Sequence, residues 1–447
     1  MTRSITLKKG LDINIIGEIL PHTPLNYALI KTIAIVPDDF PGITPKAVVS
    51  IGDKVKIGTA IIIDKNDPNI KLTSPSAGIV REIVRGERRK IIKIIIDCTG
   101  NEFEQFGTST INNPNASRLL LQQSGLWAHL RQRPYDIVPA STSSPRDIFI
   151  TAFDSAPLAP NYDFIIERNY NTNEIIAGIQ LLKSLTSGNI YISTRKDSSI
   201  KNIEGATIIN IEGPHPAGNV GIQVANISPI NKGENVWTLN IITLCKIGHL
   251  ALTGHIDPTT IIAITGSEIK NPQYIKAIEG ANIEDLLIDN LKTLNNIRLI
   301  SGNVLTGHAI TINDHLRFPY LHITAIPEGD KTDEFMGWAS LSPNKMSVNR
   351  SFIGHFLKKK FRPDARILGS RRAMIMSGEY DKVLPMDIYA EYLLKAIISR
   401  NIDQMEALGI YEVAPEDFAL CEYVDTSKIE IQKIVREGLD YLRHEIE

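Results

Sequence analysis

Lys71–Lys90 reads KLTSPSAGIVREIVRGERRK, and this order of residue types predicts strands separated by tight turns. An apolar, β-branched run follows the Ser-Pro-Ser-Ala-Gly sequence and ends at Gly86, and a second such run, KIIKIIID, comes next. Upstream, Gly52-Asp53 lies between the apolar runs of AVVSIGDKVKIGTAIIID, a combination typical of a β-hairpin. We therefore predict a β domain, with boundaries at residues 1–104.

This region resembles biotinyl and lipoyl carrier domains. In those domains a GD-x-V-x-x-G sequence leads to a hairpin bearing a modified lysine, and an A/S-P-x-x-G sequence follows. The carrier spacing, counted back from Pro75, reaches Asp67, and Lys65 is out of register. Asp67-Pro68-Asn69 also has the residues of a turn, because proline pre-sets φ. We expect a biotinyl/lipoyl-like scaffold or docking domain without a carrier lysine; a true carrier is the alternative.

The composition bounds the class of protein. The chain has 447 residues, too many for one hydrophobic core, so we expect several domains. Its net charge of −2 argues against a nucleic-acid partner. No apolar run reaches the ~18 residues of a transmembrane helix, so work at a membrane would need a partner. Cys98, Cys245 and Cys421 are too few for a four-thiolate cluster, and they favour a reducing compartment.

The second region alternates strand and helix signals. Residues 105–117 are polar, which predicts a linker. Arg146–Phe153 reads as a strand, and a helix opens at Asn171, where Glu174 completes a capping box. Further strands follow, and β–α–β alternation predicts a parallel sheet in a Rossmann-like α/β domain at residues 105–256.

A nucleotide-binding version of this domain needs glycines where main-chain amides approach phosphates. Here the strand RDIFITAF is followed by DSAPLAPN instead of G-x-G-x-x-G, and no G-x-x-x-x-G-K-[ST] sequence occurs. GPHPAGNVG, at Gly213–Gly221, is the one stretch rich in glycine and proline. A rigid crossover between strands and a ligand-contact loop both fit it.

The last two regions differ in type. Ile261–Leu287, followed by NIRLISGNVLTGHAI, resembles a soluble-ligand-binding β-grasp (SLBB-type) domain, placed at residues 257–330, with Asn282 capping a helix. Residues 331–447 read as a mainly helical C-terminal domain, whose apolar stripes are more typical of a core than of cofactor contacts.

A basic run lies within HFLKKKFRPDARILGSRR. Such a run is usually a solvated face, and contact with phospholipid or an acidic partner is the alternative. Its basic residues are Lys358, Lys359, Lys360, Arg362, Arg366, Arg371 and Arg372.

A series of segments, in order along nearly the whole chain, is similar to the A subunits (alpha subunits) of the Na+-translocating NADH:quinone reductases, bacterial respiratory complexes. That family is in turn related to the C subunit of the Rnf complex and to the flavin subunit of complex I, which hold FMN and NADH in a glycine-rich loop. The segments are KKGLDINIIG, KLTSPSAGIVREIVRG, SGLWAHLRQRPYDIVP, TAFDSAPLAPN, GPHPAGNVG, VWTLN, TGHIDPTTIIAITG, EFMGWAS, GEYDKVLPMDI and ALGIYEVAPEDFALCEYV.

The resemblance implies that this subunit binds no redox cofactor. The position of the flavin loop reads GLWAHLRQRPY, at Gly125–Tyr135, with bulky side chains where glycines would allow close backbone approach. Near the C-terminus only Cys421 remains, and Asp425 stands where a second cysteine is expected. A cubane cluster needs about four protein ligands. The flavins, iron–sulfur centre and ubiquinone would belong to the complex as a whole.

The resemblance also implies a peripheral subunit on the cytoplasmic face of the bacterial inner membrane. Its complex would oxidise NADH, reduce ubiquinone and export Na+, and the chain would not be catalytic alone. The expected partners are the other subunits, especially the membrane-embedded quinone/flavin B subunit, and ubiquinone. A purely structural docking module without a ligand is the alternative, and a free-standing NADH-dependent flavoprotein is disfavoured by the missing glycine loop.

If quinone contacts this chain, the filled-in loop is the expected place. An indole can stack on a flat ring, a phenol can hydrogen-bond a carbonyl oxygen, and guanidinium groups can donate to a carbonyl or a semiquinone. Packing of the same side chains in a seam between domains is the alternative. The candidates are Trp127, Arg131, Arg133, Tyr135 and His215.

Overall fold

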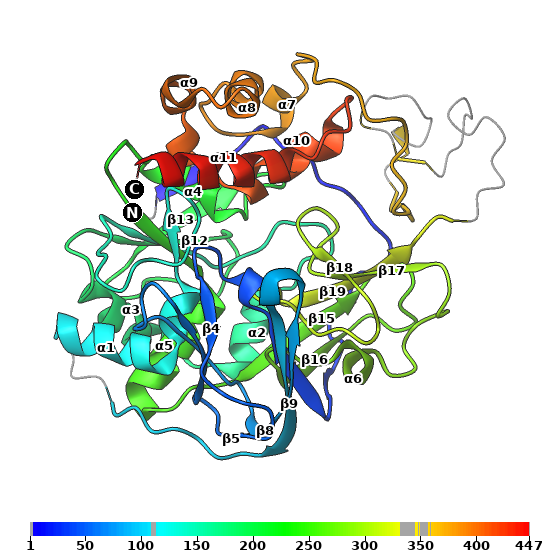
Figure 1. The fold of residues 1–447 in the computed structure, drawn as a ribbon. Helices are drawn as coiled ribbons and strands as arrows, with labels where there is room; N and C mark the ends of the chain where they lie inside the picture. The colour runs from blue at the N-terminus through cyan, green and yellow to red at the C-terminus, as the bar shows by residue number, and fades with distance from the viewer. Residues whose placement is uncertain are drawn as a thin grey trace.

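The computed structural model describes residues 3–108, 113–330, 345, 346, 348, 356, 357 and 359–446. Within these residues the chain forms two six-stranded sheets, one four-stranded sheet and one three-stranded sheet, with a group of helices at the C-terminal end (Figure 1). A mixed α+β, multidomain fold is therefore confirmed. The EFMGWAS segment and Lys358 lie outside the described residues.

The stretch quoted first belongs to the N-terminal β domain. Gly52 has a φ of 92° and Asp53 accepts a hydrogen bond from Ser50 N at 2.7 Å, so the predicted turn is present. The strands on either side of the turn do not pair with each other, because the strand before it pairs with residues 62–64 and the strand after it pairs with residues 78–79. One sheet has the order β3 (Thr32–Ile35), β9 (Ile91–Gly100), β8 (Ala77–Arg85) and β5 (Lys54–Val55); the other has β4 (Pro45–Ala47), β6 (Ala60–Asp64) and β7 (Lys71–Thr73).

The β6–β7 hairpin carries the DKNDPN turn and is anchored at its tip. The Asp67 carboxylate accepts a hydrogen bond from Ser141 N at 2.8 Å, and the Asn69 amide donates to Ser141 Oγ at 3.4 Å. The turn therefore lies against the second domain. Its likeness to a carrier hairpin stays a prediction.

Two short strands near the start of the chain pair with sheets outside the N-terminal β domain. β1 (Arg3–Thr6) pairs in parallel with β13 (Thr207–Glu212) of the second domain, and β2 (Leu25–Tyr27) pairs in parallel with β16 (Gln273–Ile278) of the third. Strand membership here is set by long-range hydrogen bonding, which local sequence does not encode. The N-terminal segment thus connects two sheets outside its own domain.

The second domain contains the predicted parallel sheet. Asn171 accepts a hydrogen bond from Glu174 N at 3.2 Å and donates its own N–H to Glu174 at 2.8 Å, so the capping box is confirmed. The predicted linker is shorter than expected, because Asn113 caps a helix that begins at Pro114. The sheet order is β1, β13 (Thr207–Glu212), β12 (Ile190–Thr194), β11 (Ile148–Thr151), β14 (Val236–Asn240), β10 (Arg131–Arg133), with α1 (Pro114–Ser124), α2 (Tyr162–Asn169), α3 (Thr172–Lys183), α4 (Val220–Ile227) and α5 (Ile241–Thr253) around it.

Alternate residues of β11 face two different cores, as expected of a strand buried on both sides. Ile148 and Ile150 pack in the core that contains α3 and α5. Phe149 packs in the core that contains α4 and the C-terminal helices. The C-terminal helices therefore cover one face of the parallel sheet.

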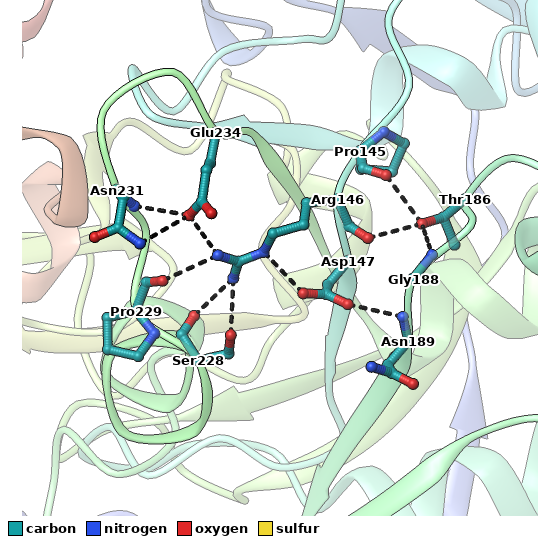
Figure 2. Close-up of polar contacts among 10 residues, drawn as sticks. All are labelled: Pro145, Arg146, Asp147, Thr186, Gly188, Asn189, Ser228, Pro229, Asn231 and Glu234. Atoms are coloured by element: carbon teal, nitrogen blue, oxygen red, sulfur yellow. Dashed lines mark hydrogen bonds and ion pairs between the residues drawn. The ribbon is translucent and has the colours of Figure 1, made fainter.

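The edge of this sheet at which β11, β12 and β14 begin is closed by a polar network around Arg146 (Figure 2). The guanidinium group donates to Asp147 at 2.9 Å, to Ser228 O at 3.0 Å and to Glu234. Asp147 accepts in turn from Asn189 N at 2.7 Å. Ligands of parallel sheets bind at the opposite, carboxyl edge, so we read this network as structural.

The third domain and the C-terminal helices complete the fold. Asn282 accepts from Glu284 N at 2.9 Å, which confirms the predicted cap. In α8 (Ala390–Ile398), Leu393 is buried, whereas the adjacent Tyr392 is 57% exposed. The elements are β15 (Thr259–Thr265), β16 (Gln273–Ile278), α6 (Ile283–Leu287), β17 (Ile297–Ser301), β18 (His308–Ile310), β19 (His322–Pro327), α7 (Tyr380–Val383), α8 (Ala390–Ile398), α9 (Ile402–Ala407), α10 (Ala419–Val424) and α11 (Ile431–Ile446).

Candidate functional site

A cavity of about 470 Å³, here called the central cavity, opens at the carboxyl ends of β11 and β14. β11 and β14 are adjacent and parallel, and β12 lies on the far side of β11. The strand order therefore reverses between them, which is where open α/β sheets bind ligands. Thr151 and Asp154 line the cavity from the end of β11, and Asn240 lines it from the end of β14.

All four regions of the chain contribute to the wall. The N-terminal domain supplies Asp39, the filled-in loop Arg131, the third domain His322, and the C-terminal helices Arg436. A smaller apolar lobe of about 80 Å³ shares His129, Phe318 and other residues with the cavity and continues towards Leu72, Ile242 and Ile256. The site is thus assembled between domains.

The filled-in loop makes a tight turn between Gln132 and Ile137, whose main-chain groups bond each other at 2.7 and 3.2 Å. Within it Tyr135 has a φ of 79° and Asp136 a φ of 52°. A bulky residue at such a φ is strained and persists only where its surroundings impose it. Arg436 on α11 imposes it here, donating to Tyr135 O at 2.7 Å and to Asp136 O at 3.3 Å.

Arg131 and Arg133, two residues apart on β10, have different environments. The Arg131 guanidinium lines the cavity, donates to Asp39 O at 2.6 Å and lies 5.8 Å from the Phe40 ring centroid. Arg133 is fully buried and bonds two carboxylates of the C-terminal region, Glu416 and Asp417, at 2.7 Å each. The Arg131 side chain therefore faces the cavity, whereas Arg133 joins two domains.

The carboxylate of Asp417 lies where helix α4 begins. A Cβ on Gly221, the second residue of this helix, would stand 2.3 Å from Asp417 Oδ2 and 2.4 Å from Arg133 Nη1. The start of a helix after a parallel strand is where such folds hold anionic groups. In this protein the carboxylate of Asp417 occupies that position. The neighbouring residue, Glu416, lines the cavity.

His215 lies in the GPHPAGNVG loop, and its contacts fit both a rigid crossover between strands and a loop that contacts a ligand. Its main-chain N–H bonds Asp12 at 2.9 Å and its carbonyl accepts from Leu11 N at 2.8 Å, so the loop is packed against the N-terminal segment. Its ring lines the cavity with Nδ1 3.0 Å from Ser155 Oγ, and Nε2 has no hydrogen-bond partner among the described residues.

Four histidines line the cavity, and burial lowers the pKa of each. The pKa of His129, of His215 and of His322 falls to about 4, and that of His308 is lowered as well. These rings are therefore neutral at neutral pH. A neutral imidazole carries one donor and one acceptor nitrogen, which suits a ligand rich in carbonyl or hydroxyl groups.

Carboxyl groups outnumber arginines along the wall. Burial raises the pKa of Asp39 and Asp154, and it raises that of Glu416 to about 8, against the opposing effect of Arg133. The Glu416 side chain is 41% accessible to solvent, because it faces the cavity. The cavity itself is enclosed by protein on several sides, so the carboxyl group is still largely removed from bulk water. A phosphate group would meet these acids, so the wall favours an uncharged ligand. The acidic and arginine residues that line the cavity are Asp38, Asp39, Asp136, Asp154, Glu416, Arg131 and Arg436.

The five predicted contact residues divide into two groups. Arg131 and His215 line the cavity. Trp127 is completely buried, donates to Pro139 O at 2.8 Å and packs edge-on against Trp237. Arg133 and Tyr135 are also buried.

Sequence reasoning missed several cavity residues. Asp154 could have been predicted, because it lies three residues after the end of a parallel strand, and such positions face the ligand edge of the sheet. No local pattern pointed to Glu416, Arg436 or the histidines of the third domain.

The cysteines lie apart from the cavity. Cys245 and Cys421 are buried, and burial raises the pKa of each thiol. Asp425 accepts a hydrogen bond from the Tyr380 hydroxyl at 2.8 Å. Within the described part of the chain, no group of three or more His, Cys, Asp or Glu side chains is arranged to hold a metal ion. In that same part, no helix has both the length and the apolar character required to cross a bilayer.

Fold and cavity together define a multidomain α+β protein with a cavity at the point where the strand order of its parallel sheet reverses. At the start of helix α4, where related folds bind an anion, this protein places the carboxylate of Asp417. Three family models match this chain: the NqrA N-terminal barrel-sandwich hybrid domain at residues 5–99, the NqrA second alpha/beta domain at 115–256 and the NQRA (SLBB) C-terminal domain at 261–311.

Relatives from three bacteria match almost end to end, and each is named as the A subunit of a Na(+)-translocating NADH-quinone reductase. Those of Histophilus somni (strain 2336) and Vibrio alginolyticus are each 35% identical, and that of Pasteurella multocida (strain Pm70) is 34% identical; each match covers 99% of this chain and 100% of the relative. The chain belongs to this family, the A subunits of the Na+-translocating NADH-quinone reductases. A solved NAD+-reducing [NiFe]-hydrogenase in the H2-reduced state is similar over 49% of this chain and 48% of its own, with 14% identity and a TM-score of 0.35, too low to support an argument.

Proposed function

We propose that this chain is a peripheral subunit of a Na+-pumping NADH:ubiquinone oxidoreductase, and that its central cavity receives the head group of ubiquinone. The relatives that match it end to end are named as subunits of such a reductase. The chain would act within that complex and would carry out no redox chemistry alone.

The observation that carries the quinone proposal is the chemistry of the cavity wall. A quinone is uncharged and offers two carbonyl oxygens, which match the neutral histidines and the guanidinium of Arg131. The Arg131 guanidinium donates to main-chain oxygens of Ala128, Leu130 and Asp39, which fixes the group at the wall. The lobe beyond His129, of about 80 Å³, offers room for the first part of an isoprenoid tail.

Trp127, Arg133 and Tyr135 have a supporting role in this proposal. Trp127 is surrounded by protein, so stacking on a ring would require its neighbours to move. Arg133 holds the loop to the C-terminal region, and Tyr135 makes the strained turn that places Arg131.

The chain is proposed to hold no redox cofactor of its own. Helix α4, whose start would face a flavin phosphate, faces Asp417 instead, and a phosphate there would meet two carboxylates. The flavins and the iron–sulfur centre would then belong to other subunits. The absorption spectrum of the purified chain tests this: a flavin or iron–sulfur band that copurifies in stoichiometric amount would contradict it.

The expected partners are the other subunits, above all the membrane-embedded B subunit, on the cytoplasmic face. The family assignment supports a partner of this kind. Affinity purification of the tagged chain from solubilised membranes tests the docking proposal, and recovery without any membrane subunit would contradict it.

The quinone proposal is tested with Arg131→Gln in the assembled enzyme. Because Arg131 faces the cavity, we expect the KM for quinone to rise by about tenfold while the KM for NADH stays unchanged. Arg118→Gln is the matched control, since Arg118 also donates to main-chain oxygens, of Ser141 and Ser143, but lies outside the cavity.

A photoreactive quinone provides an independent readout. Labelling of the peptide around Arg131 or His215 supports the proposal. No label on this chain, together with an unchanged quinone KM in Arg131→Gln, would favour the second function, a structural docking module without a ligand. The burial of Trp127, Arg133 and Tyr135 between domains is the observation that favours that second function.

A further inference from the structure

The segment of residues 359–379, drawn in gold in Figure 1, contains no helix or strand and leads into α7. It is fixed at both ends. Phe361 N donates to Asn14 O at 2.8 Å, and Gly378 N donates to the Glu391 carboxylate at 2.8 Å. Between these anchors, all residues from Ile367 to Ala373 are exposed. We call residues 366–376 the basic loop.

Two pairs of large aliphatic side chains stand out from the basic loop. Ile367 and Leu368 are 58% and 64% exposed, and Ile375 and Met376 are 57% and 40% exposed. Grouped exposure of this kind usually marks a surface that contacts something else. The backbone of the loop is held by Arg372 N, which donates to Ser427 O at 2.8 Å.

The charge of the loop is entirely positive. Arg371 and Arg372 lie between the two aliphatic pairs and are exposed, and residues 366–376 contain no Asp or Glu. Upstream, exposed Phe356 and Leu357 precede further lysines, so the same combination occurs twice along the chain. The ion pair of Arg371 with Glu430 at 3.0 Å is itself solvent-exposed and therefore weak.

We propose that the basic loop binds the surface of a membrane that contains anionic lipid. The aliphatic pairs would enter the interface between head groups and acyl chains, and Arg371 and Arg372 would bond lipid phosphates. Aliphatic side chains next to arginines have the composition of an interfacial anchor. A protein partner is the less favoured occupant, because the loop offers neither a groove nor a strand edge that would fix a partner in register.

The proposal goes beyond the quinone and docking functions and is tested without them. The purified full chain is sedimented with vesicles of phosphatidylglycerol mixed with phosphatidylcholine, and separately with vesicles of phosphatidylcholine alone. We expect binding to the anionic vesicles, weakening as salt rises. Each arginine near an anionic surface contributes roughly fivefold to the partition coefficient, so Arg371→Glu combined with Arg372→Glu should lower it by more than about tenfold.

The double variant Ile367→Ser, Leu368→Ser measures the contribution of the apolar side chains to vesicle binding. We expect this variant to lower the partition coefficient by about tenfold. Arg88→Glu combined with Arg89→Glu is the matched control, since these adjacent arginines are exposed on the turn between β8 and β9. Thermal unfolding of every variant confirms that the fold is retained.

Absence of vesicle binding, or equal binding by the control and the loop variants, would overturn the proposal. If vesicles do not bind but the loop variants fail to copurify with membrane subunits, the occupant is a protein and the lipid proposal is likewise overturned. Neither result bears on the quinone KM, so failure here is distinguishable from failure of the proposed function.

Discussion

Arg133 and Asp417, 284 residues apart in the chain, form a completely buried ion pair with Nη1 2.7 Å from Oδ2. Arg133 follows the cavity-lining Arg131 by two residues, and Asp417 follows the cavity-lining Glu416 by one. The pair therefore fixes two walls of the central cavity relative to each other. The geometry of the cavity depends on this contact between domains.

Arg133→Met should destabilise the fold by about 3–5 kcal/mol, because it leaves Asp417 as a buried charge without its partner. Urea unfolding of the isolated chain measures the loss. The matched control is Arg371→Met, which breaks an exposed ion pair with Glu430 and should cost less than about 1 kcal/mol. Equal costs for the two variants would contradict the structural role assigned to Arg133.

Gly221→Ala should be nearly as damaging as the loss of Arg133, although it adds only one methyl group. That group would stand 2.3 Å from Asp417 Oδ2, so the ion pair or helix α4 must shift, at a cost of about 2–4 kcal/mol. Gly100→Ala is the control, since its added Cβ would meet nothing closer than 3.7 Å. A Gly221→Ala protein as stable as wild type would show that Asp417 does not lie against the start of α4.

Glu416 should make stability fall as pH rises from about 4.5 to about 8. Burial raises the pKa of this carboxyl group to about 8, so the folded state retains a proton that the unfolded chain releases near its ordinary pKa of about 4.5. The contribution is present below pH ~4.5 and is lost as pH rises through ~8. In Glu416→Gln, which keeps the uncharged form at every pH, the melting temperature should depend less on pH across this window. Glu430→Gln, at an exposed glutamate, should leave the wild-type dependence unchanged.

His322 should act with the opposite sign and at lower pH. Its ring is 2% exposed, and burial lowers its pKa from about 6.5 to about 4, so it stays neutral where the unfolded chain becomes protonated. Stability is fully present above pH ~6.5 and is lost as pH falls through ~4, by about 3 kcal/mol for this group. His322→Gln should remove that part of the acid sensitivity in a pH series of urea unfolding. His444→Gln, at an exposed histidine on α11, should not.

The β6–β7 hairpin should carry no covalent cofactor. Its tip bonds Ser141 through Asp67, and a swinging arm requires a free tip. The intact mass of the chain purified from its own host should equal the mass calculated from the sequence. An adduct with the mass of lipoyl or biotinyl on Lys65 would contradict this.

Local sequence predicted the elements whose causes are local. The cap at Asn171 and the cap at Asn282 were readable because their partners lie two or three residues away. The turn at Gly52 was readable for the same reason, yet the pairing of its flanking strands was not, since β5 finds its partner in β8. The end of the predicted linker was missed because Asn113 was not recognised as a cap.

The sequence by itself determined the family, the alternation of strands and helices, and the lack of a glycine loop, because ordered motifs and residue spacing are properties of the chain. Only the tertiary structure decided which side chains form the cavity and which are packed beneath it. Arg131 and Arg133 are two residues apart, of the same type and on one strand, yet one faces the cavity and the other is buried against Asp417. That difference depends on carboxylates brought in from almost three hundred residues away, and no local pattern encodes such an approach.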